Sequence, residues 1–109
     1  MRESCYASNI NKSIGLLRAK ENIELVEVAS KPRTATFRVT TILSDIEPDQ
    51  ELVTHAAQFV HKHLPPRVQR FVRVEVVPVN TGHNEHYEDS EPDFSVSQTR
   101  FFVRVICLR

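Results

Sequence analysis

The strongest constraint on the fold of this chain is the alternation of apolar and polar residues in two stretches. Residues 68–79 and 95–108 each place apolar side chains at every second position. The side chains expected on the inner face are Val72, Val74, Val76, Phe101, Val103, Val105 and Cys107. A period of two is that of a β-strand with one buried face. The pattern therefore predicts two antiparallel strands joined by residues 81–94, a long acidic hairpin loop.

Two shorter stretches predict a first hairpin. Residues 34–43 are rich in β-branched side chains, which favour strands. In residues 23–29 the apolar phase shifts after Leu25, which indicates a β-bulge or a strand covered on both faces. Turn-forming residues 30–33 separate the two strands.

Apolar residues at helical spacing predict two helices. Residues 8–20 form the first helix. A wider apolar stripe over residues 48–64 predicts the second, with Pro48 at its first position and Pro65-Pro66 ending it. The stripe consists of Leu52, Ala56, Phe59, Val60 and Leu64.

The expected order is therefore αββαββ, in one domain over residues 1–109 with residues 1–7 disordered. The chain has 109 residues, of which 40% are hydrophobic and 26% charged, so it suits a single folded core. The simplest way to bury these faces is an α+β fold, ferredoxin-like in outline or permuted. A mainly antiparallel four-stranded sheet then carries two helices on one face.

The charge balance limits the classes of partner. Fourteen basic and 14 acidic residues give a formal net charge of zero, which argues against non-specific coating of nucleic acid or membrane and tolerates self-association. Arginine outnumbers lysine ten to four, a bias toward interfaces or anionic ligands. No apolar run spans a membrane and residues 1–20 resemble no secretory signal, so we expect a cytoplasmic or virion protein.

Arginine and aromatic residues alternate on the expected outer face of the sheet. The candidate residues for binding nucleic acid or a protein partner are Arg38, Phe71, Arg73, Arg100, Phe102 and Arg104. Such side chains can stack on bases and pair with phosphates, but the glycine- and aromatic-rich consensus of RNA-recognition motifs is absent. The other interpretation is a solvated or subunit-facing surface.

Metal binding and catalysis have weaker support. His83 and His86 form an HxxH pair beside carboxylates, but surface histidines are the expected interpretation. P-loop, GxGxxG and GxSxG motifs are absent, and two glycines leave little scope for a phosphate loop. We therefore expect no cofactor and a non-enzymatic protein. Cys5 and Cys107 are expected to be reduced, with Cys107 in the core; the alternative is a disulfide that joins the two ends of the chain, for which the sequence has no supporting motif.

Acidic residues gather in the long loop between the last two strands. The candidates for an oligomer contact are Glu85, Glu88, Asp89 and Glu91. In a homo-oligomer, the loop of one subunit could reach the arginine face of the next, which would build a ring or filament. The same charges could pair within one chain.

In element order, residues 35–64 and the strand residues 101–105 are similar to two groups of assembly proteins. These are the tail-terminator and head–tail connector proteins of tailed phages, and the ring-building and pilus-assembly domains of bacterial secretion machines. The resemblance implies a structural module that self-associates through sheet edges or the outer sheet face. The alternatives are a nucleic-acid-binding domain, and a small enzyme or metal-binding protein centred on residues 83–93.

Overall fold

The computed structural model describes residues 7–43, 48–81 and 98–108, and all seven elements lie within these ranges. In chain order they are α1 (Ala7–Glu21), β1 (Ile23–Lys31), β2 (Thr34–Thr41), α2 (Gln50–Lys62), α3 (Pro66–Gln69), β3 (Val72–Thr81) and β4 (Gln98–Cys107). The strands form one sheet with the order β1-β2-β4-β3, and every neighbouring pair is antiparallel. The predicted α+β class is confirmed, and the αββαββ order of the main elements is consistent with a ferredoxin-like fold.

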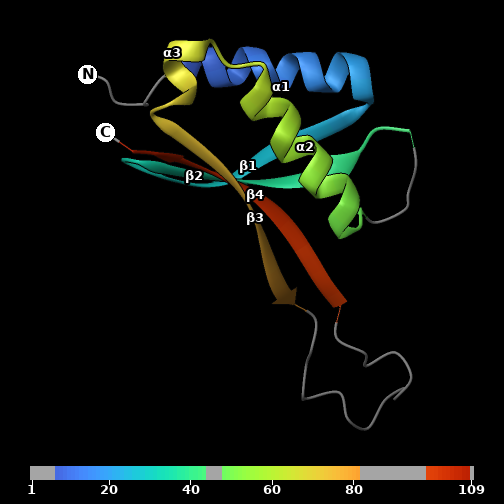
Figure 1. Ribbon diagram of the computed structural model, residues 1–109. Coiled ribbons are helices and arrows are strands. Elements are labelled where there is room, and N and C mark those ends of the chain that lie inside the picture. Colours follow the sequence, from blue (N-terminus) through green and yellow to red (C-terminus); the bar gives the residue numbers. More distant parts are fainter. Residues whose placement is uncertain (1–6, 44–47, 82–97, 109) are drawn as a thin grey trace, which may run out of the picture.

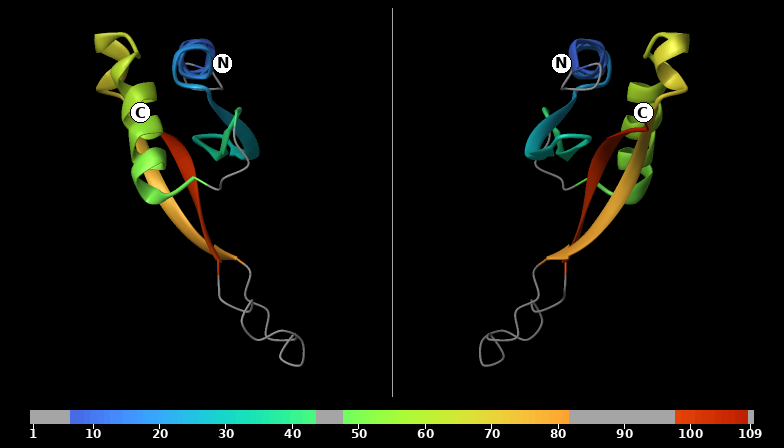
Figure 2. Two further views of the ribbon diagram at one scale, coloured as in Figure 1. Left: turned by 90° about the vertical axis from the view of Figure 1, so that its right-hand side faces the viewer. Right: turned by 90° about the vertical axis from the view of Figure 1, so that its left-hand side faces the viewer.

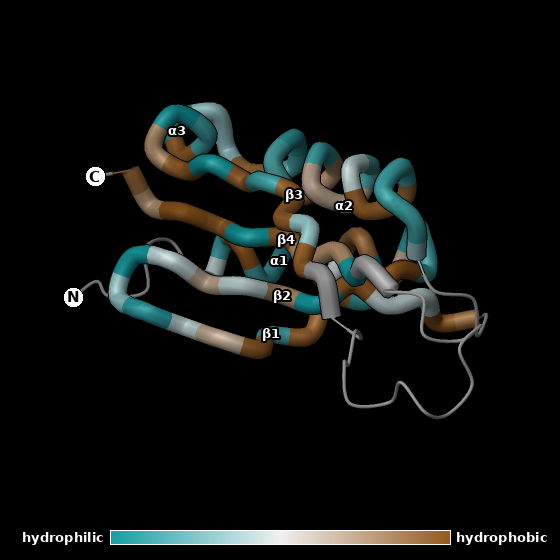
Figure 3. Tube along the Cα trace, turned by 90° about the horizontal axis from the view of Figure 1, so that it is seen from below, coloured by the Kyte–Doolittle hydropathy of each residue, from teal (hydrophilic) through white to brown (hydrophobic). Residues whose placement is uncertain are grey.

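The two long helices lie on the same face of the sheet (Figures 1 and 2). Helix α1 packs against β1 and α2, whereas α2 packs against β3 and β4. The opposite face of the sheet, which Figure 3 views directly, has no helix on it in the described part of the chain. The fold is therefore a two-layer structure with one covered and one open sheet face.

The core lies between these two layers. Leu17 of α1, Val53 and Val60 of α2 and Val103 of β4 have no exposed surface, and Val72 of β3 has almost none. Burying side chains of this size stabilises the fold by about 1.5–3 kcal/mol each. The inward positions of β3 and β4 are those that the alternating pattern predicted.

The first strand contains a β-bulge. The pairing of β1 with β2 shifts in register between Glu27 and Ala29. The bulge lies beyond Val26, which pairs with Arg38 and points away from the face of Leu25, so the change of apolar phase after Leu25 comes from apolar residues on both faces of β1 and not from the bulge. The bulge that the sequence allowed is present, but no residue of β1 after it is buried, and Val28 is 45% exposed.

The second helix begins two residues later than predicted. Asp49, not the residue before Pro48, is its N-cap, and the Asp49 carboxylate Oδ1 accepts a hydrogen bond from the Leu52 amide at 2.9 Å. The helix is therefore capped by a side chain that satisfies one of its free amides. Pro48 lies outside the helix and not at its first position.

A short helix, α3, replaces the predicted start of the third strand. Pro66 is its first residue, where the fixed backbone angle of proline favours helix and the missing N–H costs nothing. Val68 is buried in α3, and a buried valine is compatible with either a strand or a helix at this position. Strand β3 begins at Val72, and Phe71 lies in the turn before it, where its carbonyl accepts from the Leu108 amide at 2.7 Å.

A pair of adjacent leucines tests this description of the core. Leu17 has no exposed surface, whereas Leu16 beside it is 40% exposed. We expect Leu17→Ala to lower the free energy of unfolding by about 2–5 kcal/mol, because it leaves a cavity, and Leu16→Ala to lower it far less. Urea denaturation of both variants measures the difference. Equal losses would contradict the placement of α1.

Candidate functional site

The candidate site is the open face of the sheet, opposite the helices. The strand register places Val26, Arg38, Phe102 and Val77 in one row across β1, β2, β4 and β3. Their neighbours along the strands, Phe37 and Val103, are buried on the helix side, so this row points the other way. We call this surface the outer face.

Four arginines surround the row. Arg38 comes from β2, Arg100 and Arg104 from β4, and Arg73 from β3. Together with Phe102, they account for five of the six residues that the sequence predicted to share one face. The sixth, Phe71, lies in the turn before β3 and outside the sheet.

One carboxylate balances part of this positive charge. Glu75 Oε2 lies 3.4 Å from Arg73 Nε, and Glu75 Oε1 lies 3.7 Å from Arg104 Nη2. Within the described residues, neither Arg38 nor Arg100 has an ion-pair partner. The outer face is therefore locally cationic although the whole chain is neutral.

Two arginine nitrogens on this face are buried without a partner. Nε of Arg100 and Nε of Arg104 make no hydrogen bond within the described structure. An unpaired buried donor costs about 1–3 kcal/mol, more for a charged group. A carboxylate or carbonyl oxygen arriving at this face would satisfy these donors.

The rest of the outer face is partly apolar. Val26, Phe102, Val77 and Ile106 are all half-buried, so the arginines stand among hydrocarbon side chains. Figure 3 shows the resulting mixture of hydrophilic and hydrophobic positions along the strands. Arginine and aromatic residues are the types enriched at protein–protein interfaces, where lysine is depleted.

The sequence candidates in the acidic loop fall outside the described residues. These are His83, His86, Glu85, Glu88, Asp89 and Glu91. In residues 7–43, 48–81 and 98–108, His, Cys, Asp and Glu form no group of three that could hold a metal ion.

Two histidines of α2 and the histidine that caps its C-terminus make structural contacts. His55 Nε2 lies 3.2 Å from Glu21 Oε1 and so links α2 to α1. His61 Nε2 lies 3.3 Å from the carbonyl oxygen of Gln69, which ties α2 to α3. The His63 ring stacks on Phe59 with ring centroids 4.1 Å apart. These contacts connect α2 to α1 and α3 and stabilise the end of α2.

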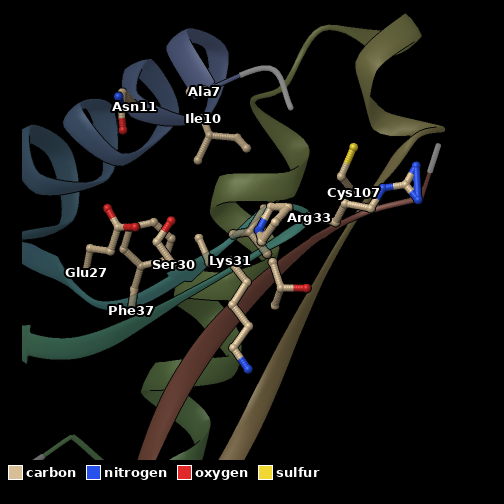
Figure 4. A pocket seen from close by; sticks show the side chains of 13 residues that line it. Ala7, Ile10, Asn11, Glu27, Ser30, Lys31, Arg33, Phe37 and Cys107 are labelled. Carbon is tan, nitrogen blue, oxygen red and sulfur yellow. The ribbon is translucent and has the colours of Figure 1, made fainter. Parts of the chain in front are cut away.

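A small pocket lies between α1 and the β1–β2 turn and encloses about 210 Å³. Figure 4 shows Ile10 and Asn11 of α1 on one side and Ser30 near the turn on the other, with Lys31 pointing away from α1. The floor includes Phe37, whose side chain is buried. The pocket is therefore an apolar recess with a polar rim.

Cys107 lines this pocket and is disulfide-bonded. The prediction of a reduced thiol was wrong for this residue, and its side chain is only partly buried. Two cysteines far apart in sequence carry no spacing signal, so the bond was only an alternative to the expected reduced thiols. A disulfide-bonded sulfur supplies no thiolate, so Cys107 is not a nucleophile here.

Comparison with known proteins adds no relative. No family model, no curated protein and no solved structure matches this chain. No helix in the described residues is long and apolar enough to cross a membrane.

Removing the central carboxylate tests the electrostatics of the outer face. The side chains of Arg73 and Arg104 are 58% and 40% exposed, so their pairs with Glu75 are screened by solvent. We expect Glu75→Gln to lower the free energy of unfolding by less than about 1 kcal/mol, with the difference vanishing in about 1 M NaCl. Urea denaturation at two salt concentrations measures this, with the exposed Glu27→Gln as control. A salt-independent loss of several kcal/mol would contradict this description.

Proposed function

We propose that the chain is a non-enzymatic interaction module that self-associates through the outer face as part of a larger assembly. The observation that carries this proposal is a sheet face, free of helices in the described residues, on which four arginines surround Phe102 and only Arg73 and Arg104 have an ion-pair partner there, Glu75. A surface that mixes arginine, an aromatic ring and aliphatic side chains suits the core of a protein interface.

The charge distribution favours a second copy of the chain as the partner. Residues 85–93 contain five of the 14 acidic residues and no lysine or arginine. The remainder therefore carries 14 basic and nine acidic residues, a formal charge of +5. The sequence thus contains its own complement to the outer face, and complementary charge gives both attraction and orientation.

The same charges favour a head-to-tail contact. Two outer faces placed against each other would bring Arg38 and Arg100 of one copy near those of the other, and like charges repel. Residues 85–93 of one copy on the outer face of the next form a heterologous contact, which generates a ring or a filament. Such an assembly matches the element-order resemblance to phage connector and secretion-ring proteins.

The two edge strands disfavour self-association by edge pairing, which favours the outer face as the contact surface. Strand β1 forms one edge and contains the bulge between Glu27 and Ala29, while β3 forms the other and contains Pro78, which has no N–H to donate. Bulges and prolines protect edges against pairing over their full length. Full-length pairing between the edges of two copies is therefore disfavoured.

The proposal also includes the environment in which the assembly works. Disulfide bonds persist in oxidising surroundings, including virion surfaces, and are rare in the cytosol. The disulfide at Cys107 thus favours a virion component over a cytoplasmic one.

Nucleic-acid binding through the same arginines is the second candidate. Phe102 offers one stacking surface, but Phe71, the second predicted aromatic, is outside the sheet. Base-stacking sheets use several aromatic side chains. We therefore treat this function as an alternative outcome of the experiment below.

Two charge-reversed variants test the head-to-tail contact. In one, Arg38→Glu and Arg100→Glu reverse the charge of the outer face; in the other, Glu88→Arg and Asp89→Arg reduce the formal charge of residues 85–93 from −5 to −1. We expect the natural chain to form an oligomer that dissociates when salt rises from about 50 to 500 mM. Each variant alone should be monomeric, and their mixture should form a 1:1 dimer, because the only complementary contact left joins the intact acidic segment of the first variant to the intact outer face of the second. Light scattering on a sizing column measures the masses.

A control and two contrary outcomes complete the experiment. Arg67→Glu changes an exposed arginine of α3, away from the outer face, and should leave the oligomer intact. A natural chain that is monomeric in low salt would refute self-association. A 260/280 nm absorbance ratio showing co-purified nucleic acid, lost in the Arg38→Glu, Arg100→Glu variant, would assign the face to nucleic acid instead.

A further inference from the structure

A long groove runs between α2 and the edge strand β3, on the side of the molecule away from β1. It encloses about 840 Å³ and lies on the helix side of the sheet. Its lining residues are Thr54, Ala57, Gln58, His61, Lys62, Val72, Arg73, Val74, Val76 and Leu108. The groove shares only Arg73 with the outer face, so the two surfaces are separate.

One wall of the groove is a strand with an unused edge. Strand β3 pairs with β4 on one side, and in the described residues no backbone hydrogen bond involves its other side. Residues 72–77 precede Pro78, so this part of the edge retains all its N–H donors. An unpaired row of donors and acceptors is a template for another strand.

The floor of the groove is apolar and only partly covered. Val74 and Val76 point toward the helix layer, yet both keep exposed surface because no strand continues the sheet beyond β3. Leu108 is 51% exposed at the same groove. Side chains at alternate positions of an added strand would cover these residues.

The rim of the groove carries positive charge. Lys62 comes from the last turn of α2, and Arg73 comes from the start of β3. Lys62 has no ion-pair partner in the described chain. Among the described residues no aspartate or glutamate lines the groove, so a ligand with acidic side chains meets complementary charge.

We propose that this groove binds an extended acidic peptide segment of a protein partner, which pairs with β3 as a fifth strand. Backbone hydrogen bonds to residues 72–77 supply general affinity, as in other modes of strand addition. Apolar side chains at alternate peptide positions enter the groove, and an acidic side chain at a position between them points to the other side of the sheet, where Arg73 lies. An edge strand beside a helix thus provides both the backbone pairing and the specificity pocket.

The test uses a fluorescein-labelled peptide of ten residues that alternates valine with glutamate or threonine. Two further peptides carry N-methyl groups on one or the other alternate set of backbone nitrogens. Only one set faces the edge of β3, so we expect one N-methylated peptide to lose about tenfold or more in affinity and the other to bind as the parent does. Fluorescence anisotropy measures binding to the full chain.

A pair of glutamine variants locates the binding site. Gln58→Trp fills the groove from an exposed position on α2, and we expect it to weaken binding about tenfold. Gln50→Trp, an exposed glutamine on the same helix but outside the groove, is the matched control. The Arg38→Glu, Arg100→Glu variant should bind the peptide normally, so failure here is distinguishable from failure of the self-association proposal.

Three results would overturn this inference. The first is equal binding of the two N-methylated peptides, which excludes strand pairing. The second is unchanged binding by Gln58→Trp, which places the peptide elsewhere. The third is a dimer through β3 that the peptide does not dissociate, which assigns the edge to a second copy of the chain.

Discussion

The antiparallel pairing of β2 with β4 is the interaction on which the rest of this structure depends. It joins two hairpins that would otherwise each be a marginal two-stranded unit. Its register sets Phe37 opposite Val103 on the covered face and Arg38 opposite Phe102 on the open one. A slip of one residue would bury the arginines and expose the core, so one register defines both the core and the candidate site. The strand pairing that builds the core therefore also creates the surface on which the proposed function rests.

The placement of both helices on one side gives the other face its character. An antiparallel sheet can leave one face exposed to solvent, and such a face is usually polar. Here the open face also contains Phe102 and three half-buried aliphatic side chains beside four arginines, which exposure to solvent does not explain. The Nε atoms of Arg100 and Arg104 are buried and unpaired, a cost that a partner's oxygen atoms would remove. The positive charge of this face and the acidic residues 85–93 balance within a neutral chain. These features together are the basis for proposing head-to-tail self-association.

Much of the fold could be predicted from the sequence because the patterns are local. Alternating apolar residues identified β3 and β4, and the β-branched residues of 34–43 identified β2. Five of the six outer-face residues followed from the same alternation. Other features depend on contacts between distant residues or on competing local preferences. Pro66 starts a helix where apolar Val68 also suited a strand, so Phe71 was misplaced. The strand order and the disulfide at Cys107 have no local signal at all.

The most direct test of the central claim is the chemical accessibility of the outer-face arginines in the natural chain. Phenylglyoxal modifies exposed guanidinium groups, and mass spectrometry of peptides gives a rate for each arginine. In about 50 mM salt the account predicts that Arg38 and Arg100 react several-fold more slowly than in about 500 mM salt, where the contact is screened. Arg67, outside the outer face, should react at the same rate in both. Equal rates for Arg38 and Arg100 at the two salt concentrations would contradict the account.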